Sequence, residues 1–399
     1  MALRGDQINA VSSSVSLTTL SHSSTGDLYQ VPPQPILPIE IVEEIISNLP
    51  VKFLSQLRCI CKSWNSLISD PKFTRRHLRR SNRRILIVRF MNRSRDINYM
   101  SYPLPSILKA VTTGGMQLDN PREYGNRNYS IIGSCDGIIC RCNFSHELGH
   151  SFVVWNPSIN KFWELTPLEK PMLEDCDGGR AFHSYGFGYD QLSNSFKLVV
   201  IFHYKCCSGS YKSHVMVHTL GSNFWRKIEE FPGIPYCASG NNGICVSGAI
   251  NWLARGTAGI ISLNLGKESY KEFLQPDYGI KVHNLTMEIV RDCLCILTNS
   301  KDVWIMKEYG NTKSWTKLFS FPSYFLRDWF PYHRAYGSIC VLEDDESLFY
   351  SDSGIDIFSY KNGTFRSSSE LENPALIKDT QAGIMDMYVE IESLISPLP

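Results

Sequence analysis

The sequence predicts a small all-α module near the N-terminus, followed by an all-β, propeller-like domain of about six blades. Three observations favour this architecture. Between residues 37 and 78, apolar residues recur at helical spacing. From residue 85 onward, short β-branched and aromatic runs alternate with turns rich in Gly, Asn, Asp and Pro. Within this second region a hairpin pattern repeats about every fifty residues, which is the size of a propeller blade.

The chain begins with a segment that we expect to be a disordered tail, residues 1–34. It is rich in Ser and Thr, has few aromatic residues, and ends in the run Val31-Pro32-Pro33-Gln34-Pro35. Such a composition buries too little apolar surface to offset the conformational entropy that folding removes.

Three short amphipathic helices are predicted next. Pro38 suits a helix entry, Pro50 ends the first helix, and Asp70 with Pro71 opens a fourth helical turn. A module this short has a marginal core. Four large apolar residues exceed what such a core can absorb: Ile39, Phe53, Leu54 and Trp64. The excess indicates either a docking surface for the helices of a partner or an ordinary helical N-terminal domain.

A basic stretch follows, with cations at Lys72, Arg75, Arg76, Arg79, Arg80, Arg83 and Arg84. Their spacing places them on one face if the helix continues. Nuclear targeting or nucleic-acid binding is one interpretation. No aromatic residues for base stacking are interleaved, and the rest of the chain is not basic, so we favour a solvated face on a helix that joins two domains.

The repeat in the β region consists of an apolar strand, a polar turn and an aromatic residue that opens a second strand. Its aromatic anchors are Trp163, Trp225, Tyr270, Trp315 and Phe365, spaced 62, 45, 45 and 50 residues apart. A degenerate copy spans residues 85–102. Between the hairpins lie glycine-edged strands, such as Gly133–Cys140 and Gly243–Trp252. Small residues are expected where inner strands crowd a propeller axis.

Composition argues against several classes of protein. The 399 residues carry a formal net charge of +1 and are 43% hydrophobic, which is typical of a globular chain with no bulk affinity for nucleic acid or membrane. No apolar run approaches the roughly 18 residues of a membrane span. No signal peptide is evident, so we expect a cytoplasmic or nuclear protein, or both.

The 13 cysteines, an odd number, indicate reduced thiols in such a compartment. The pairs Cys59/Cys61, Cys140/Cys142 and Cys293/Cys295 could each present two thiolates to a metal. They lie far apart in the sequence, and Cys also behaves as a small buried hydrophobe. We therefore expect no metal and no other cofactor.

No catalytic residue is predicted. The glycine-rich run Tyr185–Asp190 lacks a following helix signal, so it is not a phosphate-binding loop, and no G-x-S-x-G elbow is present. Propeller enzymes draw active sites from several blades, however. A propeller enzyme with a helical N-terminal cap therefore remains the alternative.

The segment 37–68 resembles the F-box of plant F-box proteins. The resemblance rests on Leu37-Pro38, Ile41, Ile45, Leu49-Pro50-Val51, Leu54, Arg58-Cys59, Cys61-Lys62-Ser63-Trp64 and Leu67-Ile68. Phe53 and Ile39-Glu40 are its departures from the motif. It implies docking on the Skp adaptor of a cullin–RING ubiquitin ligase, with these residues at or just under the interface: Leu37, Pro38, Ile41, Ile45, Leu49, Pro50, Val51, Leu54 and Trp64.

The region from residue 85 to the end resembles the F-box-associated, kelch-like domain of the same proteins. The motifs are Gly133-Ser-Cys-Asp-Gly137, Trp155-Asn-Pro157, Tyr185-Gly-Phe-Gly-Tyr-Asp190, Asn223-Phe-Trp225 and Gly248-Ala-Ile-Asn-Trp-Leu253. The resemblance implies an F-box module with its linker helix at 35–84, a propeller at 85–399, and a non-catalytic substrate receptor of an SCF (Skp–cullin–F-box) ubiquitin ligase. Its partners would be the Skp adaptor, through it the cullin and RING subunits, and a protein target.

The loop Phe321–Gly337 combines aromatic residues with two arginines, which is typical of a recognition hot spot if the loop is exposed. If it is buried, it is a packed connection between blades. The candidate target-binding residues are Tyr324, Arg327, Trp329, Tyr332 and Arg334.

Overall fold

The computed structural model describes most of the chain in segments. These are residues 37–91, 97–108, 115–118, 129–145, 149–169, 182–233, 242–254, 259–279, 282, 285–298, 302–322, 340–341, 345–351, 354–367 and 384–397. The chain divides into two compact units, residues 1–42 and 43–399. The tail predicted for residues 1–34 lies outside the described residues.

The described part of the first unit comprises Leu37, Pro38 and the start of helix α1 (Ile39–Ile46). The carbonyl oxygen of Pro38 accepts hydrogen bonds from the backbone N–H groups of Ile41, at 3.0 Å, and Val42, at 3.1 Å. Proline therefore opens the helix, as the sequence predicts, because its missing N–H would have no partner there.

The second unit begins with the end of α1, α2 (Val51–Leu57), α3 (Lys62–Ser69) and α4 (Pro71–Arg80). Pro50 directly precedes α2. Asp70 caps α4 by accepting hydrogen bonds from the N–H groups of Lys72, at 2.6 Å, and Phe73. The sequence-based assignment of Leu54 to the apolar excess is wrong. Its side chain is 0% exposed, because this small module buries more than its length suggested.

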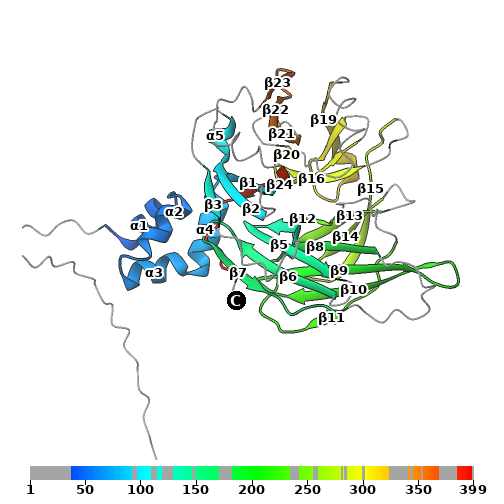
Figure 1. Ribbon diagram of the computed structural model, residues 1–399, viewed down its shortest axis with the longest axis horizontal. Coiled ribbons are helices and arrows are strands. Elements are labelled where there is room, and N and C mark those ends of the chain that lie inside the picture. The colour runs from blue at the N-terminus through cyan, green and yellow to red at the C-terminus, as the bar shows by residue number, and fades with distance from the viewer. Residues whose placement is uncertain are drawn as a thin grey trace, which may run out of the picture. The chain divides into compact units, whose positions relative to one another are not determined.

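The β region forms six four-stranded antiparallel sheets, the blades of a propeller (Figure 1). Blade 1 contains β24 (Ile384–Ile391), β1 (Arg84–Met91), β2 (Ile97–Pro103) and β3 (Met116–Leu118), with helix α5 (Leu104–Leu108) after β2. Blade 2 contains β4 (Ser130–Cys135), β5 (Ile138–Ser145), β6 (Gly149–Asn156) and β7 (Lys161–Glu164). Blade 3 contains β8 (Phe182–Asp190), β9 (Ser195–Lys205), β10 (Tyr211–Thr219) and β11 (Trp225–Lys227).

The other three blades follow the same order. Blade 4 contains β12 (Ile244–Val246), β13 (Ala249–Leu253), β14 (Gly259–Asn264) and β15 (Ser269–Leu274). Blade 5 contains β16 (Thr286–Val290), β17 (Cys293–Leu297), β18 (Asp302–Met306) and β19 (Trp315–Ser320), with a 3-10 turn η1 (Thr312–Ser314) before β19. Blade 6 contains β20 (Cys340–Val341), β21 (Glu346–Ser351), β22 (Gly354–Ser359) and β23 (Thr364–Ser367).

The predicted repeat corresponds to the third and fourth strands of a blade. All five predicted hairpins form: β6–β7, β10–β11, β14–β15, β18–β19 and β22–β23. The degenerate copy at 85–102 is instead the second and third strands of blade 1, β1 and β2. The prediction of about six blades is confirmed.

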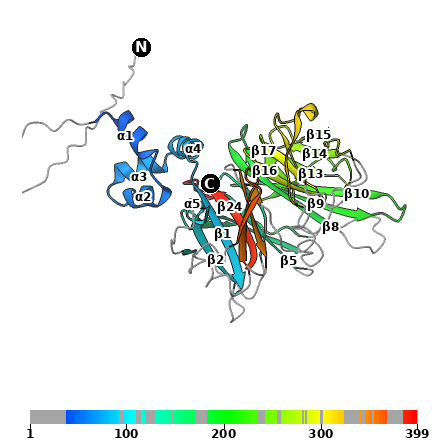
Figure 2. The ribbon, with the colours of Figure 1, turned by 90° about the horizontal axis from the view of Figure 1, so that it is seen from above.

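The C-terminal region closes the ring. Strand β24 pairs antiparallel with β1, with Arg84 opposite Ile391, and the two strands lie side by side in Figure 2. Beyond β24 the chain runs past blade 2, where Asn156 Nδ2 donates to the carbonyl oxygens of Ser393, at 2.9 Å, and Ile395, at 2.8 Å. Asn156 is fully buried. The Trp155-Asn-Pro157 motif thus holds the segment Ser393 to Ile395 against blade 2.

The core of the propeller lies between the blades. Phe152 and Val154 of blade 2 pack with Leu198 of blade 3, and Ile201 of blade 3 packs with Trp252 of blade 4. Apolar clusters of the same kind fill the other four junctions. Because each blade is covered on both faces, its central strands are nearly continuously apolar.

Glycines allow the inner strands to approach closely, as the sequence predicts. Gly186 of β8 and Gly243 form a parallel bridge, and the Gly243 N–H donates to the Tyr185 carbonyl oxygen at 2.6 Å. A Cβ atom at either glycine would overlap the side chains of Ile250 and Trp252. A larger residue would therefore push blades 3 and 4 apart.

The aromatic anchors connect neighbouring blades. Trp225 Nε1 donates to the Thr166 carbonyl oxygen at 2.8 Å, just beyond the outer strand of the preceding blade. The Tyr270 hydroxyl donates to the Glu229 carbonyl oxygen at 3.2 Å, and Trp315 Nε1 donates to the Leu274 carbonyl oxygen at 3.1 Å. The anchor position therefore supplies a hydrogen bond between blades as well as apolar area.

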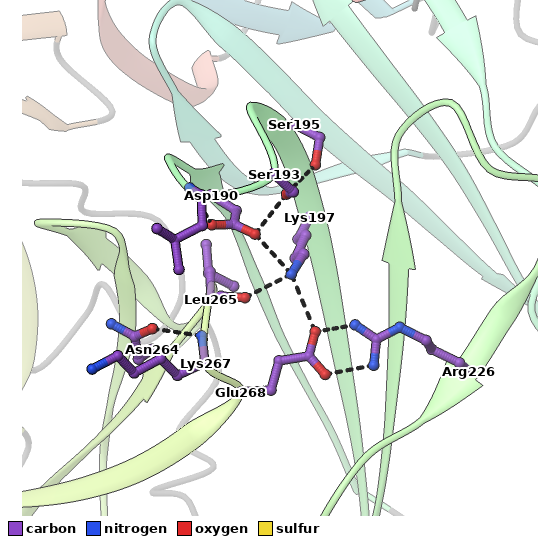
Figure 3. A network of polar contacts seen from close by, with 10 residues as sticks. Asp190, Ser193, Ser195, Lys197, Arg226, Asn264, Leu265, Lys267 and Glu268 are labelled. Atoms are coloured by element: carbon purple, nitrogen blue, oxygen red, sulfur yellow. Dashed lines mark hydrogen bonds and ion pairs between the residues drawn. The ribbon is translucent and has the colours of Figure 1, made fainter.

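A buried polar network also joins blades 3 and 4 (Figure 3). Lys197 Nζ on β9 lies 2.9 Å from Asp190 Oδ2 and 3.1 Å from Glu268 Oε1, and it donates to the Leu265 carbonyl oxygen at 2.6 Å. Arg226 of β11 forms a second ion pair with Glu268. Burial raises the pKa of Asp190, but hydrogen bonds from Ser193 and Lys197 outweigh it, so the net pKa lies below its ordinary value.

Candidate interaction surfaces

Apolar side chains remain exposed on the helices. In the second unit these are Ile45 of α1, Phe53 of α2 and Ile60 in the turn before α3, which are 53%, 54% and 66% exposed. We call these three residues the exposed apolar set. In the first unit, Leu37, Ile39 and Ile41 are exposed as well. Large apolar side chains left in water on an ordered helix are typical of a protein-interaction site.

The residues assigned to adaptor binding differ in exposure. Four are exposed: Leu37, Pro38, Ile41 and Ile45. Three are half-buried: Leu49, Pro50 and Trp64. Val51 and Leu54 are buried, so any part they play in docking is to support the exposed side chains from beneath.

The basic stretch forms specific ion pairs. Arg76 pairs with Glu43, Arg80 pairs with Glu44 at 2.6 Å, and Arg75 pairs with Asp136 in the turn after β4. The Arg75 guanidinium also lies over the Tyr189 ring, 3.6 Å from its centroid. These contacts give the stretch a structural role beyond that of the solvated face expected from the sequence.

The directions of the strands distinguish two ends of the propeller. The first and second strands of a blade are joined at one end, the turn end, which includes Asp136 and Gly137. The fourth strand ends, and the next blade begins, at the opposite, connection end. Strand β1 is the second strand of its blade, so the chain from α4 enters the propeller at the turn end. The long connections between blades therefore leave from the end away from α4.

The candidate target-binding residues Tyr324, Arg327, Trp329, Tyr332 and Arg334 lie outside the described residues. They belong to the segment that joins the end of β19 to the start of β20, both of which lie at the connection end. Three exposed aromatic residues also lie at that end and were missed by sequence reasoning: Phe144, Phe182 and Tyr211. Strand-forming aromatic residues are usually core residues, so nothing in their local sequence marked them as exposed.

A histidine cluster lies beneath Phe144. The centroid of the Phe144 ring is 4.7 Å from that of His150 and 4.8 Å from that of His183. His150 Nδ1 is hydrogen-bonded to the Tyr185 hydroxyl at 3.0 Å. Burial, together with the neighbouring His183, lowers the pKa of His150 to about 3. Burial also raises the pKa of the nearby Cys142 thiol to about 12. The His150 ring and the Cys142 thiol are thus both neutral at physiological pH, and both side chains pack as part of the core.

Neither a metal site nor a membrane-spanning helix is present in the described residues. Within the described segments, no three His, Cys, Asp or Glu side chains are arranged to hold a metal ion. In the same part of the chain, none of the helices combines the length and apolar character that crossing a membrane requires.

The fold and the exposed helices define a class: a β-propeller protein with a small N-terminal helical interaction module. A family model described as the F-box associated beta propeller domain matches residues 86–328, and a model of the F-box domain matches residues 35–76. The chain therefore belongs to the F-box proteins that carry an F-box associated β-propeller domain.

Relatives from Arabidopsis thaliana agree with this assignment. An F-box/kelch-repeat protein is 28% identical over 376 residues, covering 90% of this chain and 96% of the relative. The F-box protein CPR1 is 27% identical over 315 residues, covering 71% of this chain and 72% of the relative. F-box/WD-40 repeat-containing protein 1 is 29% identical over 309 residues, with coverage of 71% and 68%.

Proposed function

We propose that this chain is the substrate-receptor subunit of an SCF ubiquitin ligase. Its helices bind a Skp-type adaptor, and through it the cullin and RING subunits, while its propeller binds a protein target. The chain performs no bond chemistry itself. It raises the effective concentration of the target near the ubiquitin-conjugating enzyme.

The observation that carries this proposal is the exposed apolar set on helices whose core is already filled. Val51 and Leu54 are buried, yet Ile45 and Phe53 remain more than half exposed. Fully burying one such side chain in a partner contributes about 1.5–3 kcal/mol. A small number of such anchor residues carries most of the binding energy of a typical interface.

The direct test is binding of a purified Skp adaptor to the full chain by titration calorimetry. The variant Ile45→Ala/Phe53→Ala is expected to bind about 10- to 100-fold more weakly, which corresponds to about 1.4–3 kcal/mol of lost burial. Leu54→Ala is unsuitable here, because Leu54 belongs to the core and its removal leaves a cavity.

The matched control is Leu192→Ala/Phe224→Ala, which removes two exposed apolar side chains from turns of blade 3, 76% and 63% exposed. This control should bind the adaptor like the wild type. Equal affinity of the Ile45→Ala/Phe53→Ala variant and this control would contradict the proposal, as would no binding by the wild-type chain.

We further propose that the target binds at the connection end. The exposed aromatic residues Phe144, Phe182 and Tyr211 support this, because aromatic side chains dominate recognition hot spots. The loop carrying Tyr324 to Arg334 begins and ends there too. The partners proposed are thus proteins alone, neither nucleic acid nor membrane. The ten cysteines whose side chains the structure describes are free thiols, which supports a cytoplasmic or nuclear location.

A further inference from the structure

Two cysteines approach each other across the inner edge of blade 3. Cys135 ends β4, the inner strand of blade 2, and packs against the core between blades 2 and 3. Cys245 lies on β12, the inner strand of blade 4, and packs against the core between blades 3 and 4. Both inner strands lie beside β8, and they also contact each other. The thiols therefore come from blades that are not neighbours in the ring.

Gly188 of β8 provides the space between them. A Cβ atom at this position would overlap both the Sγ and the Cβ atoms of Cys245. Without that Cβ, the Cys135 and Cys245 thiols hydrogen-bond to each other and to the backbone of Tyr189. Both cysteines are free thiols in residues of intermediate solvent exposure. The site thus brings two reducing groups into contact.

We propose that Cys135 and Cys245 are an oxidative modification site, at which a hydroperoxide converts the two thiols into a reversible disulfide that links blades 2 and 4. The inference is independent of adaptor binding, since it concerns the propeller alone.

The reaction has two steps. The Cys245 thiolate attacks the nearer oxygen of the peroxide, the O–O bond breaks, and the sulfur becomes a sulfenic acid while the other oxygen leaves as water or an alcohol. The Cys135 sulfur then attacks the Cys245 sulfur, the S–O bond breaks, and the oxygen leaves as water. The two thiols lose two electrons in total, the peroxide gains them, and both thiol protons end in the products.

The surroundings assign the first step to Cys245. Hydrogen bonding to Cys135 lowers the pKa of Cys245 and outweighs the opposing effect of burial. The same hydrogen bond, together with burial, raises the pKa of Cys135 well above its ordinary value. Cys245 therefore forms the thiolate more readily, and Cys135 is the resolving thiol.

The test is oxidation of the reduced full chain by hydrogen peroxide, followed by intact mass and non-reducing peptide mapping. We expect a loss of two hydrogen atoms, a peptide linking Cys135 to Cys245, and full reversal by dithiothreitol. The bond closes a loop between residues 110 positions apart. The midpoint of thermal unfolding should therefore rise by about 5–10 °C on oxidation.

Variants identify the thiols involved. Cys135→Ser and Cys245→Ser should each abolish the linked peptide and the rise in melting temperature. Cys207→Ser, which removes an exposed thiol from blade 3, should preserve both. If a serine variant does not fold, differential alkylation of the wild-type protein identifies the thiols instead. Cys135 and Cys245 should then be protected from alkylation only after oxidation. A linkage mapped to other cysteines, or none at peroxide doses that oxidise Cys207, would overturn the proposal.

Discussion

At the scale of a single residue, Glu390 illustrates how burial in the propeller changes the pKa of a carboxyl group. It lies on β24, in register with Ile85, and is only 7% exposed. Burial raises its pKa to about 7, although a hydrogen bond from Ser134 and the charge of Arg84 act in the opposite direction. The folded protein therefore keeps this group protonated at pH values where the unfolded chain has ionised it.

This difference predicts a pH dependence of stability. An unfolded glutamate titrates near 4.3, so Glu390 stabilises the fold fully below about pH 4, and the stabilisation is lost as pH rises to about 7. Over this pH range the free energy of unfolding falls by up to about 1.4 kcal/mol per pH unit. Glu390→Gln should remove this slope, and the variant should be more stable than the wild type at pH 8 but not at pH 4.

Denaturant unfolding of the wild type and of Glu390→Gln, at pH values from 4 to 8, measures the difference. Glu272→Gln on β15 is the matched control, since that side chain is exposed. Its stability curve should run parallel to that of the wild type. A parallel curve for Glu390→Gln would mean that this carboxyl ionises in the folded protein as it does in water.

Local sequence predicted some single residues correctly. Asp70 and Pro38 act at helix ends as predicted, because capping depends on neighbours within four positions. It did not separate buried Leu54 from exposed Phe53, because helical spacing alone does not show which faces of a small module meet. The hydrogen bonds of Asn156 could not be predicted from local sequence either, since its partners lie more than 230 positions away.

At the scale of elements, neighbouring blades are joined by polar contacts as well as by apolar packing. The aromatic anchors Trp225, Tyr270 and Trp315 each donate to the preceding blade, and Lys197 connects blade 3 to the turn between β14 and β15. The hairpin pattern predicted where the anchors lie, because its period is local. It did not predict the role of Lys197, because nothing in its local sequence distinguishes it from other strand residues. Its partner Glu268 comes from the next blade (Figure 3).

The Lys197 network predicts a large effect of a single substitution. Lys197→Met would leave the buried Asp190 carboxylate without its ammonium partner, and breaking a buried pair in this way costs about 3–5 kcal/mol. The exposed Lys271→Met on β15 is the control and should change stability by less than about 0.5 kcal/mol. Denaturant unfolding provides the measurement. Equal stabilities of the two variants would show that the network contributes nothing beyond packing.

At the scale of the whole chain, the sequence predicted a helical module, a propeller and the number of blades, because each of these produces a regular spacing of residues in the sequence. The closure of the ring by β24 was not predicted, since this strand stands outside the hairpin repeat. The exposed aromatic residues at the connection end were missed for a related reason. Exposure depends on how strands from different blades meet, and spacing within one strand does not report it.

In the function that we propose, two separate surfaces act in sequence: the propeller captures a target, and the helices deliver it to the ligase. The most direct measurement is the ubiquitination of proteins captured from cells by the tagged full chain, compared with its Ile45→Ala/Phe53→Ala variant, while proteasomal degradation is blocked. We predict that both chains capture the same proteins and that only the wild type yields them ubiquitin-modified. Equal modification of the captured proteins by a variant that no longer binds the adaptor would contradict the account.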